Sequence, residues 1–175
     1  ALTDTQTLTI TVTNVDDVDP VITSNGGGST GSISFAENST SAVTTVTSTD
    51  EDNFPGTLYS ISGTDASVFD IDGTSGVLTF KSAPDFETKI DSNTDNDYIV
   101  IVTVTDGALT DTQTLTITVT DVNEVPADIS LSSTSVNENE SSGTTVGALS
   151  STDVDVGDNH DYTLVPGSGS THNIS

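Results

Sequence analysis

Residues 115–126 read LTITVTDVNEVP, and the interpretation of the whole chain starts from this stretch. Threonine alternates with Leu, Ile and Val over residues 115–120, which is the pattern of a β-strand with one buried and one solvated face. An acid, an amide and a second acid then follow as Asp121, Asn123 and Glu124, and Pro126 stiffens the backbone after them. A strand therefore leads directly into a short joint that is rich in side-chain oxygens.

The same arrangement occurs earlier, where residues 8–20 read LTITVTNVDDVDP. Residues 1–13, ALTDTQTLTITVT, recur without a change as residues 108–120, an offset of 107 residues. This period is too long for a solenoid unit and suits whole β-sandwich domains in tandem. The sequence predicts the last strand of a preceding repeat plus its linker over 1–17, a complete domain over 18–123 and the first half of a following repeat over 124–175.

The complete domain is predicted to be all-β, a seven-stranded Greek-key immunoglobulin-like sandwich. Its strands are expected over residues 21–23 with a resumption at 32–35, and over 42–46, 58–61, 68–71, 77–80, 98–105 and 112–120. Residues 72–76, DGTSG, are expected to turn a hairpin, and Phe69, Phe80 and Tyr98 to lie in the core. The last segment is expected to form strands near 129–131, 144–149 and 162–165.

Charge restricts the possible partners. The chain has 27 acidic residues, two lysines (Lys81 and Lys89) and a net charge of −25. Nucleic acids and anionic membrane surfaces need Lys and Arg, so neither is an expected partner. Self-repulsion at this charge favours bound divalent cations, and ligands that are all oxygen favour Ca²⁺. The same argument leaves disorder of the metal-free protein open as an alternative.

Cysteine is absent, which excludes disulfides and thiolate metal sites and is compatible with secretion from a bacterium. No apolar run approaches the length of a membrane span, so no membrane insertion is expected. No signal-peptide pattern precedes the first strand, and the chain is expected to be part of something longer.

Six motifs occur in a fixed order along the chain: Glu37-Asn38, Asp50-Glu51-Asp52, FDIDG at 69–73, DFET at 85–88, Asp106-Gly107 and DVNEVP at 121–126. This order resembles the cadherin repeat in its bacterial tandem form. The resemblance implies Ca²⁺ bound between successive domains. For the downstream junction it implies the ligands Glu37, Asp85, Glu87, Asp121, Asn123, Glu124, Asp153 and Asp155. For the upstream junction it implies Asn14, Asp16, Asp17, Asp50, Asp52 and Asp106.

Three departures from the family pattern bear on these sites. Asn14 stands where the family usually has Asp, which would lower the number or affinity of upstream ions. Glu124 replaces a shorter Asp, and the second linker is one residue shorter than the first. Glu138 matches Glu37, but its own junction lies past the last residue.

Structural interpretations compete with the metal sites. An Asp-x-Asp pair in a loop is usually solvated or caps a turn, and Asp106-Gly107 can simply make a tight turn. Residues 70–73 fit a hairpin turn better than a calcium loop, because they lack the remaining ligands and the helices of an EF-hand. His160 and His172 are expected to be solvated loop residues without a metal-binding partner.

Enzymatic activity is not expected, because the acids lie in linkers and turns, and no nucleophile or phosphate-binding motif occurs. The first functional hypothesis is a calcium-rigidified, secreted or cell-surface spacer or adhesion module of a large repetitive bacterial surface protein. Its partners would be neighbouring repeats and other copies of the chain in homophilic contacts. The second is a carbohydrate-binding module for surface glycans, although the chain has only eight aromatic residues. The third is a filament subunit that donates residues 1–13 to another chain.

Overall fold

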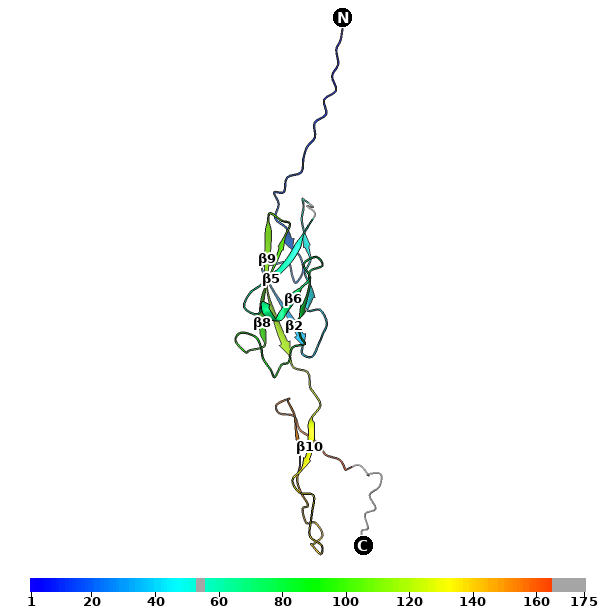
Figure 1. Ribbon diagram of the computed structural model, residues 1–175, viewed down its shortest axis with the longest axis vertical. Coiled ribbons are helices and arrows are strands. Elements are labelled where there is room, and N and C mark those ends of the chain that lie inside the picture. Colours follow the sequence, from blue (N-terminus) through cyan, green and yellow to red (C-terminus); the bar gives the residue numbers. More distant parts are fainter. Residues whose placement is uncertain (53–55, 165–175) are drawn as a thin grey trace. The chain divides into compact units, whose positions relative to one another are not determined.

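The computed structural model describes residues 1–52 and 56–164 (Figure 1). The fold is all-β, with one short 3₁₀ turn at Ala66–Val68 in the described part. The chain divides into two compact units, Ala1–Val122 and Asn123–Ser175, which are described separately. In the described residues, no helix is long and apolar enough to cross a membrane.

The first unit contains a four-stranded sheet and a three-stranded sheet. The larger has the order β2-β9-β8-β5, with β2 parallel to β9 and the other neighbours antiparallel (Figure 1). The smaller has the order β3-β7-β6, and β1 pairs with β4 separately. The strands are β1 (Val21–Ile22), β2 (Thr30–Ala36), β3 (Thr44–Thr45), β4 (Ser48–Thr49), β5 (Leu58–Ser62), β6 (Phe69–Ile71), β7 (Val77–Phe80), β8 (Asp97–Thr105) and β9 (Thr110–Thr120).

The core follows from the period-two pattern of β8 and β9. Every second residue is buried along β8 and, from Gln113 onward, along β9, and the threonines of β9 point to the other face. The aromatic residues meet in one group, with the rings of Phe69 and Phe80 4.2 Å apart and the Tyr98 ring edge-on to both. The prediction that Phe69, Phe80 and Tyr98 lie in the core is confirmed, Phe80 being partly buried.

One expected strand is divided in the structure, and another is shortened and followed by an additional strand, so the described part of residues 18–122 holds nine strands where seven were predicted. The first divides at the glycine-rich turn after Asn25, as its sequence indicated. The second, expected over 42–46, is reduced to β3 because the chain changes partner: Thr45 pairs with β7, whereas Ser48 pairs with β1. Gly76 permits the close crossing, since a Cβ there would collide with the Val46 carbonyl.

The described residues of the second unit contain one antiparallel hairpin, β10 (Ala127–Leu131) with β11 (Leu149–Thr152). The prediction of a strand over 144–149 is wrong except at Leu149, because Thr144 closes a turn onto the Ser141 carbonyl instead. Residues 162–164 form no strand, and residue 165 lies outside the described residues. Apolar side chains such as Ile129 stay exposed, since one hairpin cannot enclose a core.

Candidate metal sites

A first acidic cluster gathers all six residues predicted for the upstream junction. The Asp52 carboxylate accepts the backbone N–H groups of Asp17 (2.9 Å) and Val18 (2.8 Å), and the Asn14 amide donates to the Asp52 carbonyl. These bonds tie the linker to the loop after β4. Asp50, at that loop, accepts the N–H of Asp52 through Oδ1 at 2.9 Å. Local backbone bonds therefore fix the directions of these carboxylates.

Asp106 completes the first cluster from the turn between β8 and β9. Its Oδ1 accepts the N–H groups of Leu109 and Ala108 at 2.8 and 2.9 Å, and these bonds lower the pKa of its carboxyl. The turn interpretation of Asp106-Gly107 is thus confirmed, with Gly107 at φ 116°. The turn uses only Oδ1 of Asp106, and Oδ2 accepts no hydrogen bond within the described residues.

Three buried oxygens of this cluster have no hydrogen-bond partner within the described residues: Asp16 Oδ1, Asp50 Oδ2 and Asp106 Oδ2. Desolvation raises the pKa of the Asp16 carboxyl, and the negative charges of Asp106, Asp50, Asp52 and Asp17 raise it further. Buried carboxylate oxygens without donors are costly unless a cation faces them. Hard oxygen donors are the ligands of Ca²⁺, so these residues fit that ion.

A second acidic cluster lies after the C-terminal end of β2. One oxygen atom from each of Glu37, Glu87 and Asp121 lies within 4.8 Å of the other two. Glu37 is 3% exposed and accepts the N–H groups of Phe86 and Val122, both at 2.8 Å. It therefore fastens the end of β2 to two other segments while its charge remains beside the other two acids. Asp85 is not part of this group: its carboxylate caps the N–H of Thr88 at 2.8 Å.

The Asp-Gly motif at 72–73 behaves as the hairpin turn that was predicted. Asp72 Oδ1 accepts the N–H groups of Ser75 (2.7 Å) and Thr74 (3.0 Å), and the bond from Ser75 is the main cause of its lowered pKa. β6 and β7 pair on either side of this turn. The carboxylate is thus used in folding the hairpin.

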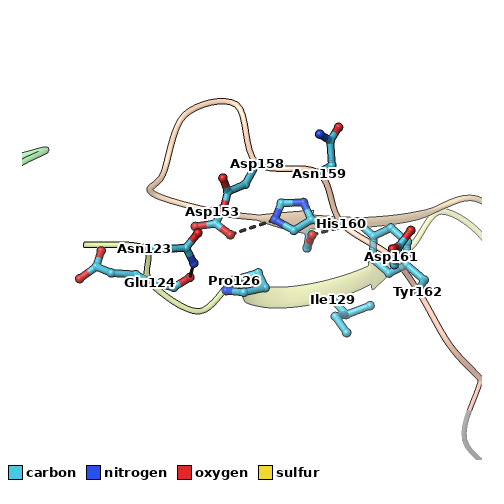
Figure 2. A pocket seen from close by; sticks show the side chains of 11 residues that line it. Asn123, Glu124, Pro126, Ile129, Asp153, Asp158, Asn159, His160, Asp161 and Tyr162 are labelled. Carbon is cyan, nitrogen blue, oxygen red and sulfur yellow. Dashed lines mark hydrogen bonds and ion pairs between the residues drawn. The ribbon is translucent and has the colours of Figure 1, made fainter. Parts of the chain in front are cut away.

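A third acidic cluster lies in the second unit, where oxygens of Asp153, Asp155 and Asp158 lie within 4.8 Å of one another. Asp155 Oδ2 accepts the N–H of Glu124 at 2.6 Å, and the Asn123 amide donates to the Glu124 carbonyl. The linker residues Asn123 and Glu124 thus belong to the surroundings of Asp155. They also line a hollow of about 290 Å³ together with Asp153, Asp158 and His160 (Figure 2).

The expectation that His160 is a solvated loop residue is wrong, because its side chain is partly buried and contacts Asp153. Its Nε2 lies 2.9 Å from Asp153 Oδ2, its side chain is 23% exposed, and this contact is the main cause of the lowered Asp153 pKa. Figure 2 shows the imidazole facing Asp153. The sequence signal was the continuation DVDVGDNH at 153–160, in which Gly157 turns the chain back. Asp158 lies in the same continuation and was not predicted as a site residue either. His172 lies outside the described residues.

A comparison with models of protein families shows which family the chain belongs to. The cadherin domain model matches residues 31–120, which is half of the chain. The chain belongs to the cadherin family. Cadherin domains are extracellular adhesion modules without enzymatic activity, and they generally bind Ca²⁺.

Solved cadherin structures share this fold at moderate sequence identity. Human protocadherin-24 EC1-2 is 25% identical with a TM-score of 0.60, covering 81% of this chain and 62% of its own. Drosophila N-cadherin EC1-4 is 25% identical with a TM-score of 0.56, covering 79% of this chain and 34% of its own. The chain thus spans less than two thirds of the cadherin structures it matches. A search of curated proteins gave no significant match.

Proposed function

We propose that this chain is a calcium-stiffened extracellular spacer or adhesion module, part of a large repetitive surface protein of the bacterial type. Calcium would fix each linker to the loops around it, so that successive domains form a stiff rod. Neighbouring repeats in the same protein would be its first partners. The near absence of Lys and Arg supports a bound divalent cation, because the chain cannot neutralise its own carboxylates.

One observation carries the proposal: three buried carboxylate oxygens of the first acidic cluster have no donor in the described residues. Asp16 comes from the linker, Asp50 from the loop after β4, and Asp106 from the β8–β9 turn. An ion held by all three would connect the linker to the body of the domain. Asp52 would position that linker through its two backbone hydrogen bonds.

The second and third clusters would supply the downstream ligands. We assign Glu37, Glu87 and Asp121 as one group of oxygen ligands, with Asp153 and Asp155 as ligands from the next repeat. Asn123 and Glu124 would contribute linker oxygens. Asp85 is a weaker candidate, because one of its oxygens already caps a turn.

Small-angle X-ray scattering of the 175-residue chain with calcium and with chelator tests the rod. We expect a smaller and more variable maximum dimension after chelation, while circular dichroism keeps most of the sheet signal. Identical scattering profiles in the two conditions would contradict the proposal.

A double substitution separates linker from core. Asp121→Ala with Asn123→Ala is expected to loosen the downstream joint in scattering at saturating calcium and to leave the unfolding transition of the first unit in place. Global unfolding of the double variant at the same calcium concentration would show instead that the joint belongs to the core.

A second candidate, a filament built by strand donation, is favoured by one observation. Leu8, Ile10 and Val12 expose 77%, 84% and 90% of their surface, although the identical residues of β9 are buried. A row of this kind could add to the sheet of another chain. Analytical ultracentrifugation in calcium tests it: a monomer at micromolar concentration would exclude the filament.

A further inference from the structure

Residues 1–13, the first copy, have the same side chains that β9 uses to hold its place in the sheet. They are identical to residues 108–120, and β9 lies between β2 and β8. Leu115, Ile117 and Val119 of β9 are 0–1% exposed, whereas the first copy is exposed throughout and forms no strand in the described structure. The described part of the chain thus holds two copies of one strand and one position in a sheet that fits it.

The polar contacts of β9 are specific, and the first copy can reproduce them. The Asp111 carboxylate accepts a backbone N–H from β1 at 2.8 Å, and the buried Gln113 amide donates to two carbonyls of the glycine-rich loop after β1. Asp4 and Gln6 are the matching residues of the first copy. A sheet that took up the first copy in place of β9 would therefore keep these hydrogen bonds.

The first copy cannot enter the sheet of its own molecule, because too few residues connect it to β1. In the sheet, Thr13 would take the place of Thr120, and Asp4 would take that of Asp111, nine positions back along the strand. Ile22 must stay beside that aspartate to donate its N–H. The nine steps from Thr13 to Ile22 would have to retrace the same length fully extended, at about 3.3–3.6 Å each, with no residue left to reverse direction. The strand must therefore come from another molecule.

We propose that residues 1–13 are an exchangeable copy of β9, which fills the position between β2 and β8 in a second copy of this chain whenever β9 leaves it. The inference deepens the second candidate of the proposed function, since it rests on strand donation and names the acceptor. The donated strand pairs parallel to β2 and antiparallel to β8, in the register of β9. Two molecules joined in this way share one sandwich.

The short connection to β8 keeps this exchange rare in the intact protein. Residues 106–109 connect β8 to β9, and a short connection gives the attached strand an effective concentration in the millimolar range. A second molecule at about 1 μM then competes at a disadvantage of about a thousandfold. Exchange should therefore become visible when β9 is damaged.

The test disables each copy by the same two substitutions in the 175-residue chain with calcium. Leu115→Asp with Ile117→Asp places two charges in the core and expels β9, and Leu8→Asp with Ile10→Asp is the matched change in the first copy. We expect the β9 variant to keep its sheet signal in circular dichroism and to assemble with rising concentration in analytical ultracentrifugation. The first-copy variant should remain a folded monomer, and the variant with all four substitutions should lose the sheet signal of the first unit.

A labelled peptide of sequence ALTDTQTLTITVT, added to the variant with all four substitutions, measures the exchange without assembly. The peptide should restore the sheet signal. It should bind this variant at least about a hundredfold more tightly than it binds wild type, whose own β9 occupies the position. The same peptide with Leu8→Asp and Ile10→Asp should neither bind nor restore the signal.

Identical behaviour of the β9 variant and the variant with all four substitutions would overturn the inference, whether both unfold or both stay folded monomers. Equal binding of the two peptides would overturn it as well. A monomeric wild type together with restoration by the peptide supports the exchange and excludes the filament, so the two proposals fail separately.

Discussion

Residues 1–13 and 108–120 have the same sequence, but only the second copy is part of a core. Leu115, Ile117 and Val119 are 0–1% exposed in β9. Their counterparts Leu8, Ile10 and Val12 expose 77% or more, and residues 1–13 form no strand in the part of the chain that the structure describes. The apolar side chains of the same thirteen-residue sequence are therefore buried in one copy and exposed in the other.

The difference shows what the alternating pattern specifies by itself. It fixes which side chains share a face, because successive residues of a strand point to opposite sides. It does not supply the strands that cover that face. β9 pairs with β2 and β8 at its edges, and its apolar face shares a core with Phe69 and Leu78 of the smaller sheet. Full burial of each large apolar side chain then contributes about 1.5–3 kcal/mol.

The largest expected effect comes from truncating the same side chain in both copies. Ile117→Ala removes a fully buried side chain and should lower the free energy of unfolding by about 2–5 kcal/mol. Ile10→Ala, in the same local sequence, should change it by less than about 0.5 kcal/mol. Urea denaturation of the two variants gives the comparison. Similar losses in both would show that residues 1–13 are packed in solution.

Stabilisation by calcium should depend on Asp106, in the turn before β9, and not on Asp4, in residues 1–13. A ligand at a hundred times its dissociation constant stabilises a protein by about 2.7 kcal/mol. Calcium at that concentration should therefore raise the unfolding temperature of the first unit. Asp106→Asn removes a charge from the first acidic cluster and should abolish most of this gain, while Asp4→Asn should keep it. A full calcium gain in Asp106→Asn would remove Asp106 from the set of ligands.

The two glutamines give a smaller contrast. Gln113 is buried, donates to the carbonyls of Gly28 (2.8 Å) and Ser24 (3.3 Å), and thereby holds the glycine-rich loop after β1. Gln113→Ala leaves both carbonyls without this donor and should cost about 1–3 kcal/mol. Gln6→Ala is the matched control and should be neutral by the same denaturation assay. Equal stability of Gln113→Ala and wild type would mean that water replaces the amide.

The smallest expected effect comes from comparing the Asp72 carboxylate, which is hydrogen-bonded in a turn, with the Asp4 carboxylate. The folded-state pKa of Asp72 is lowered from 3.8, mainly by the Ser75 N–H, so its stabilising effect is present above 3.8 and is lost as pH falls through the lower value. Asp72→Asn should therefore lower the melting temperature at pH 7, with a difference that narrows below pH 4. Asp4→Asn should show no such pH dependence. A difference that stays constant to pH 2 would contradict the assignment.

The sequence alone predicted the sandwich, the Asp72 hairpin and the long strands β8 and β9, because each depends on a local pattern of alternation or turn residues. It did not predict the partner change between β3 and β4, which depends on the close approach of Gly76 to Val46. It brought together the residues of the first acidic cluster only through the resemblance to cadherins. Asp158 and His160 were missed because their contacts with Asp153 depend on how the loop folds back.

The most direct measurement of the central claim is a calorimetric Ca²⁺ titration of the 175-residue chain with Mg²⁺ as competitor. The account predicts saturable Ca²⁺ binding that Mg²⁺ does not match. It also predicts fewer calcium ions per chain in a variant carrying Asp16→Asn, Asp50→Asn and Asp106→Asn. The same stoichiometry and affinity in this variant and in wild type would contradict the assignment of the three buried oxygens to calcium.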